Sequence, residues 1–82
     1  MKNNISELSL ASLKGCPHCQ AAKLALMKGN VTYKEILWDD PEGEKIIEGL
    51  GIQTVPVLLV PSKEGLKQIA GEKAIAEWVK AR

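Results

Sequence analysis

The pattern of apolar and polar positions predicts four β-strands in this 82-residue chain. Apolar and polar residues alternate over residues 7–12, as they do in a half-buried strand. Residues 31–38 are rich in amino acids that favour β-strands. The unbroken apolar run at residues 55–60 predicts a central strand covered on both faces. Residues 61–65 predict a turn, after which residues 66–70 pair back as an edge strand.

Three helices are predicted between and after these strands. The first begins at Pro17, a residue suited to the opening position of a helix, and ends at Gly29 as a left-handed C-terminal glycine. It is apolar most of the way round, which predicts that it is well buried.

The second helix begins at Pro41 behind the capping residue Asp40 and stops at Gly51. The third helix covers residues 72–80. Its predicted inward stripe follows helical spacing: Ile75, Trp78 and Val79.

The order strand–helix–strand–helix–strand–strand–helix places the chain in the α/β class. Two strand–helix units followed by a hairpin and a helix imply a four-stranded mixed sheet with helices on both faces. The length suits a single domain over residues 1–82.

Composition narrows the classes of partner. The net charge is only +1 and 45% of residues are hydrophobic, so neither nucleic acid nor an anionic membrane is favoured as a partner. No apolar run approaches the ~20 residues that span a bilayer. Residues 1–7 lack the apolar stretch of a signal peptide, so we expect a cytosolic protein.

Both cysteines of the chain, Cys16 and Cys19, lie in one Cys-Pro-His-Cys stretch. A structural zinc site needs four ligands, and His18 is the only further soft ligand, so a site within one chain is disfavoured. A zinc or iron–sulfur site shared by two chains stays open, as does a pair of unreactive thiols.

A redox dithiol suits the flanking residues better. With Pro17 at the first helical position, Cys16 caps the helix, where free N–H groups and the positive dipole end favour a thiolate. Lys14 adds a positive charge two residues upstream. Cys19 lies one turn further and deeper, so we expect Cys16 to attack and Cys19 to resolve.

The chain resembles the glutaredoxins of the thioredoxin fold over nearly its whole length. Glutaredoxins typically carry Cys-Pro-Tyr-Cys followed by Ala-Lys, matched here by Ala22-Lys23, and a later Thr-Val-Pro, matched by Thr54-Val55-Pro56. The resemblance implies a β-α-β-α-β-β-α thioredoxin-like fold, no bound cofactor and glutathione as co-substrate. It implies a cis bond before Pro56, and a Val55 backbone able to pair with substrate.

The same resemblance implies a substrate- or glutathione-binding set that lies around the cysteines. Its members in this chain are Lys14, Thr54, Val55, Pro56, Gly71, Glu72 and Lys73. The chain departs from the family at Gly71-Glu72-Lys73, where glutaredoxins have a glycine, a small residue and an acidic pair. Glu72 would repel the γ-glutamyl carboxylate of glutathione, whereas Lys73 would attract it.

His18 is the second departure, because it replaces the usual tyrosine. Cys-Pro-His-Cys is typical of the oxidising, DsbA-like branch of the fold. We therefore expect Lys14, Pro17 and His18 to tune the dithiol, with a protonated imidazole stabilising the Cys16 thiolate and making the disulfide more oxidising.

These observations lead to one main hypothesis, a monomeric glutaredoxin-type thiol–disulfide oxidoreductase acting on protein disulfides or glutathione mixed disulfides. Its reductant would be glutathione or a thioredoxin-reductase-like enzyme. One alternative is a glutaredoxin-like electron donor to ribonucleotide reductase, reduced by thioredoxin reductase. The other is a dimeric metal or cluster carrier, which Pro17 disfavours because proline there is generally unfavourable for cluster assembly in glutaredoxins.

Overall fold

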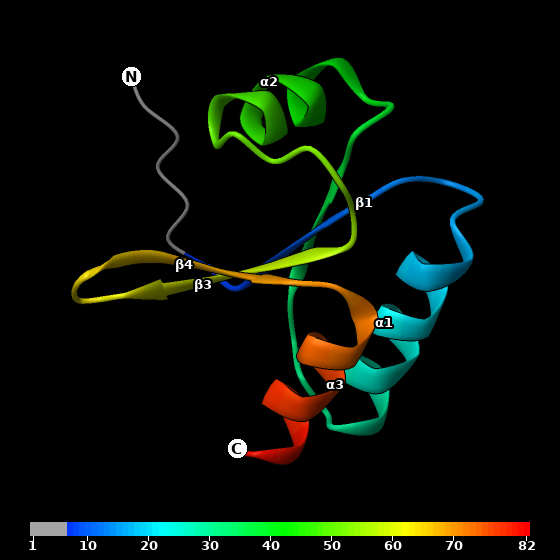
Figure 1. Cartoon of the computed structure of the whole chain (residues 1–82), viewed down its shortest axis with the longest axis vertical. Coiled ribbons are helices and arrows are strands. Elements are labelled where there is room, and N and C mark those ends of the chain that lie inside the picture. Colours follow the sequence, from blue (N-terminus) through cyan, green and yellow to red (C-terminus); the bar gives the residue numbers. More distant parts are fainter. Residues whose placement is uncertain (1–6) are drawn as a thin grey trace.

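The computed structural model describes residues 7–82, and it has the predicted order of elements (Figure 1). The N-terminal segment considered above for a signal peptide lies outside these residues, apart from Glu7. The strands and helices are β1 (Ser9–Ser12), α1 (Pro17–Lys28), β2 (Lys34–Leu37), α2 (Pro41–Gly49), β3 (Val57–Ser62), β4 (Gly65–Ala70) and α3 (Glu72–Lys80).

The four strands form one mixed sheet in the order β2-β1-β3-β4. β1 runs parallel to β2 and antiparallel to β3, and β3 pairs with β4 in a hairpin. Ala11 pairs with Val57, so the chain leaving β1 and the chain entering β3 meet at the same end of the sheet. This register brings the Cys-Pro-His-Cys stretch and Pro56 together.

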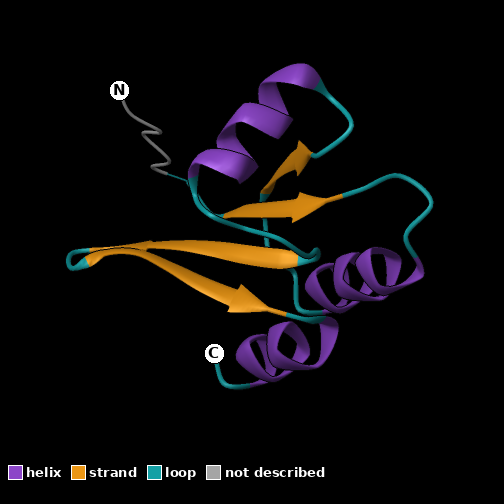
Figure 2. Ribbon diagram, turned by 45° about the horizontal axis from the view of Figure 1, so that its top comes forward, coloured by secondary structure: helices purple, strands orange, loops and turns teal. Residues whose placement is uncertain are grey.

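Helices cover both faces of the sheet, as predicted (Figure 2). α1 and α3 lie on one face and α2 on the other. The cluster under α1 and α3 has these buried members: Leu10, Ala22, Leu26, Val31, Leu58 and Ile75. The cluster under α2 has these: Ala11, Ile36, Ile47, Ile52, Val57 and Leu59. Leu58 and Leu59 are both fully buried on opposite faces, which explains the unbroken apolar run of this strand.

The prediction that α1 is well buried is wrong. Leu24 is 47% exposed and Met27 is 64% exposed. The sheet and α3 cover only one stripe of α1, whose buried members are Cys19, Ala22 and Leu26. In α3 the stripe is partly as predicted: Ile75 is fully buried, whereas Trp78 and Val79 are half-buried against the same cluster.

Gly29 ends α1, but not as the predicted left-handed glycine. Its φ is −87°, and the left-handed residue is Asn30 with φ 56°. Gly29 instead makes room for α3, because a Cβ there would lie 2.3 Å from Cγ1 of Val79. Absence of a side chain at this position lets the two helices approach closely.

The strand boundaries also differ from the prediction. β3 begins at Val57, two residues later than expected, because Val55 and Pro56 belong to the loop before it. The predicted five-residue turn contracts to Lys63–Glu64, since Pro61 pairs with Leu66 and Ser62 with Gly65. β2 covers only Lys34–Leu37, the last four residues of the predicted strand before Trp38.

Candidate active site

Cys16 stands at the end of the loop that follows β1, where it caps α1. Its backbone is extended (φ −91°, ψ 113°), Pro17 opens the helix, and its sulfur accepts a hydrogen bond from the Cys19 backbone N–H at 3.3 Å. Side chains at this position satisfy N–H groups that the helix leaves without partners. The sequence-based placement of Cys16 is therefore confirmed.

The surroundings of Cys16 lower the pKa of its thiol. The largest cause is a hydrogen bond from the Cys19 side chain, and the backbone N–H groups of Cys19 and His18 act in the same direction. Partial burial and the nearby Glu72 carboxylate oppose this shift. The cause is mainly hydrogen bonding to the ionised sulfur, which favours a thiolate that can act as a nucleophile.

Cys19 has the opposite character. It is 1% exposed, and burial together with the hydrogen bond to Cys16 raises its pKa from 9.0 to about 11. Both cysteines are free thiols in the structure. The motif thus places the half-buried Cys16 sulfur, whose pKa is lowered, beside the buried Cys19 sulfur, whose pKa is raised.

The chain before β3 and the start of α3 meet next to this pair. The Val55–Pro56 bond is cis, as the resemblance implied, and Pro56 is buried. The Pro56 carbonyl accepts a hydrogen bond from the Gly71 N–H at 2.9 Å, which ties the two segments together. Thr54, also predicted for this site, is exposed at the edge of the same loop.

His18 and Glu72 form a direct contact that the sequence reasoning missed. Nδ1 of the imidazole contacts Oε1 of the carboxylate, which joins the first turn of α1 to the first residue of α3. Their side chains are 73% and 39% exposed. Both residues were singled out from the sequence, but a separation of 54 residues gives no signal that they pair.

A second polar cluster, also missed, lies behind the cysteines. Glu35 on β2 pairs with Lys23 on α1 and accepts a 2.8 Å hydrogen bond from the fully buried Ser12 hydroxyl at the end of β1. The Lys23 hydrogen bond is the main cause that lowers the Glu35 pKa. The Lys23 charge also acts to lower the pKa of Cys19, against the larger effect of burial.

Two of the predicted binding residues, Lys14 and Lys73, are exposed and take part in no ion pair among residues 7–82. Within the same residues, no group of three or more His, Cys, Asp or Glu side chains is placed to hold a metal ion. Among residues 7–82, none of the helices combines the length and the apolar character that a membrane span requires.

Comparison with known proteins supplies the family. The sequence model of the glutaredoxin family matches residues 8–65, which is more than half of the chain and includes both cysteines and Pro56. The chain belongs to the glutaredoxin family. None of the curated proteins matches the chain.

A solved glutaredoxin has the same fold. The solution structure of glutaredoxin from Brucella melitensis superposes with a TM-score of 0.65, at 20% sequence identity, over 99% of this chain and 86% of that one. The predicted thioredoxin-like α/β fold is therefore confirmed. Family and fold together support a thiol–disulfide oxidoreductase.

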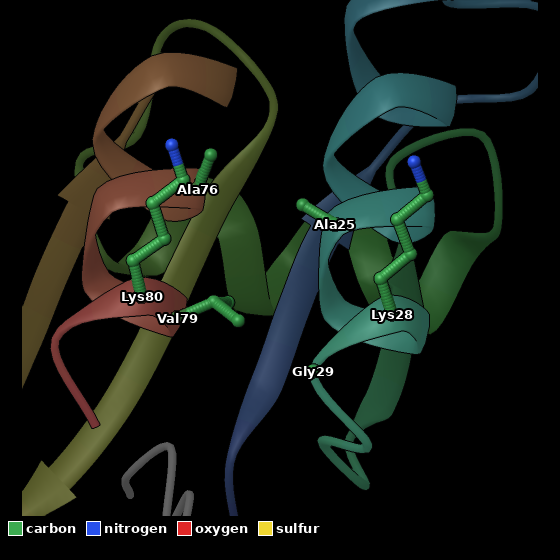
Figure 3. Close-up of a pocket in the computed structure, with 6 residues that line it drawn as sticks. All are labelled: Ala25, Lys28, Gly29, Ala76, Val79 and Lys80. Atoms are coloured by element: carbon green, nitrogen blue, oxygen red, sulfur yellow. The ribbon is translucent and has the colours of Figure 1, made fainter.

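One hollow of this glutaredoxin-family chain lies away from the cysteines. It measures about 360 Å³ and opens between the C-terminal halves of α1 and α3 (Figure 3). Its lining consists of Ala25, Lys28, Gly29, Ala76, Val79 and Lys80. None of these is among the residues gathered around the dithiol, so the hollow is separate from the candidate active site.

Proposed function

We propose that this glutaredoxin-family protein reduces protein disulfides, or mixed disulfides of glutathione, through Cys16 and Cys19. The observation that carries the proposal is the contrast between the two sulfurs. Cys16 accepts hydrogen bonds that lower its pKa, including one from the Cys19 backbone N–H with 3.3 Å between nitrogen and sulfur. Cys19 itself is buried, and its thiol has a pKa of about 11. This contrast suits an attacking thiolate and a protonated partner that acts second.

The reaction has two exchange steps. The Cys16 thiolate attacks one sulfur of the substrate disulfide, the substrate S–S bond breaks, and one substrate thiolate leaves. Cys19 then gives up its proton to the departed substrate thiolate or to water and attacks the Cys16 sulfur, so the mixed-disulfide bond breaks and the second substrate thiolate leaves. Two electrons have passed to the substrate, and the protein is left with a Cys16–Cys19 disulfide.

Two serine variants test these roles. Cys16→Ser should abolish exchange with every disulfide substrate, because no other thiol of the chain stands at a helix N-terminus. Cys19→Ser should keep part of the activity with a glutathione mixed disulfide, which one thiol can attack, and lose reduction of a protein disulfide. The measurement is the rate with each substrate; equal loss in both variants and both assays refutes the assignment.

The reductant follows from the same site. We propose glutathione or a thioredoxin-reductase-like enzyme, and the position of Glu72 at the start of α3 favours the enzyme, because the carboxylate opposes binding of another anion there. The protein would then resemble the glutaredoxin-like donors to ribonucleotide reductase. Comparing turnover with glutathione and its reductase against turnover with thioredoxin reductase tests this choice.

A cluster-carrying dimer is the contrasting outcome. It would give a coloured, dimeric protein on purification, whereas the proposed oxidoreductase is expected to be a colourless monomer. Visible absorbance and the molecular mass in solution therefore discriminate between the two functions.

A further inference from the structure

The His18–Glu72 contact gives the active site a charged rim built from two distant parts of the chain. The pair bridges α1 and α3 beside Cys16, and the Glu72 charge acts directly on the Cys16 sulfur. Both side chains are solvent-accessible, at 73% and 39% exposure. The pair therefore belongs to the solvent-accessible surface next to Cys16, which a disulfide substrate can contact.

The sign of the rim differs from what the sequence motif suggests. Lys14 and His18 on their own would make the approach to Cys16 cationic. Glu72 changes this, because the carboxylate is negative whereas the imidazole is charged only when it is protonated. As long as the Glu72 carboxylate is ionised, the pair is therefore negative or neutral in sum and not positive.

The start of α3 strengthens this character. Its capping residue is Gly71, which supplies no side-chain cap, and Glu72 is the acidic residue of the first turn. A carboxylate there already complements the positive end of the helix dipole, so a substrate anion gains less from it. Lys73 is the next residue and, at 3.6 residues per turn, points about 100° away around the helix axis.

From this arrangement we propose that Glu72 is a specificity-determining residue, which makes the site prefer disulfides flanked by a cationic side chain over disulfides flanked by an anionic one. The inference rests on the disulfide reductase function proposed above. The disfavoured class includes glutathione mixed disulfides, because the tripeptide carries carboxylates close to its sulfur. Lys14, exposed in the loop before Cys16, is the charge that opposes this preference.

The test uses two synthetic peptides, each joined by a disulfide to the same small neutral thiol. They are identical except that the residue after cysteine is Lys in one and Glu in the other. The rate of peptide thiol release by the protein is divided by the rate with dithiothreitol, which removes the intrinsic difference in reactivity. The wild-type protein should favour the Lys peptide by roughly 2- to 5-fold, the range expected for one partly exposed charge pair.

Glu72→Gln is the test variant and Glu77→Gln the matched control. Glu77 is an exposed acid on the same helix, and its side chain has no ion-pair partner among residues 7–82. Glu72→Gln should bring the Lys-to-Glu peptide ratio close to one, and Glu77→Gln should leave it at the wild-type value. Added salt should weaken the wild-type preference as well, because exposed charges are screened.

A ratio between substrates isolates specificity from general reactivity. Removing the Glu72 charge also relieves the effect that raises the Cys16 pKa, but this alters the rates with both peptides alike. An unchanged ratio in Glu72→Gln, or an equal change in Glu77→Gln, overturns the inference and leaves the proposed function standing. Failure of the wild-type protein to reduce either peptide overturns both.

Discussion

At the scale of single residues, the dithiol depends on hydrogen bonds more than on the charged neighbours that the sequence emphasised. Three groups favour the ionised form of Cys16: the Cys19 side chain and the backbone N–H groups of Cys19 and His18. A tyrosine at position 18 would keep that N–H. The imidazole of His18 contacts the Glu72 carboxylate, and that carboxylate acts to raise the pKa of Cys16.

This geometry leads to a prediction for His18→Tyr. Loss of the imidazole leaves the Glu72 charge without its partner, so the Cys16 pKa should rise. The disulfide should then become less oxidising, by ~30 mV for each ~1.4 kcal/mol of lost thiolate stabilisation. The double variant with Glu72→Gln should return the pKa toward the wild-type value. Ultraviolet absorbance of the thiolate during a pH titration, with a redox titration against glutathione, measures both effects. If wild type and single variant share one pKa and one potential, His18 is only an exposed side chain.

At the scale of elements, close approach of backbones fixes how the helices sit on the sheet. Gly43 lies in α2, where a Cβ would be 1.8 Å from the carbonyl oxygen of Leu37 at the end of β2. A backbone oxygen cannot move aside as a flexible side chain does. The α2–β2 contact therefore requires glycine at this position.

Gly43→Ala should accordingly destabilise the protein, although alanine is the better helix former. We expect a loss of about 1–3 kcal/mol in the free energy of unfolding, the usual range for overpacking. Lys45→Ala, an exposed position on the same helix, should stay within about 0.5 kcal/mol of wild type. Urea unfolding of the three proteins gives the comparison, and a stable Gly43→Ala protein would mean that α2 can shift away from β2.

Elements were predictable from sequence wherever a local signal specified them. Pro17 and Pro41 marked two helix starts correctly, and the apolar run identified the central strand. Errors arose where a distant element decides the outcome. Gly29 is glycine because α3 packs on it, and Leu24 and Met27 are exposed because no element within residues 7–82 covers them. The His18–Glu72 pair exists only once α3 lies beside α1.

At the scale of the whole molecule, the cluster of Ser12, Lys23 and Glu35 links the fold to pH. It joins β1, α1 and β2 behind the cysteines, and it lowers the pKa of Glu35 below the usual 4.5. A carboxyl whose pKa is lower in the folded protein than in the unfolded chain stabilises the fold at pH values above the unfolded-state pKa. That contribution is lost as the pH falls through the folded value.

We therefore expect Glu35 to account for part of the loss of stability below about pH 4.5, the ordinary value of its carboxyl. The contribution should be below about 1 kcal/mol, because the pair is partly exposed. Glu35→Gln should lose less stability than wild type over this acid range, whereas Glu44→Gln, exposed on α2, should follow the wild-type curve. Denaturant unfolding at successive pH values measures this; parallel curves for wild type and Glu35→Gln would contradict it.

The two-residue turn between β3 and β4 has a practical consequence for work with this protein. Lys63 and Glu64 are exposed at one end of the sheet, and the loop that carries Cys16 leaves β1 at the other end (Figure 1). Exposed turns of polar residues accept insertions and chemical labels most readily. A fluorophore or surface tether attached at Lys63 would orient the molecule with its dithiol facing outward, toward an immobilised or dissolved substrate.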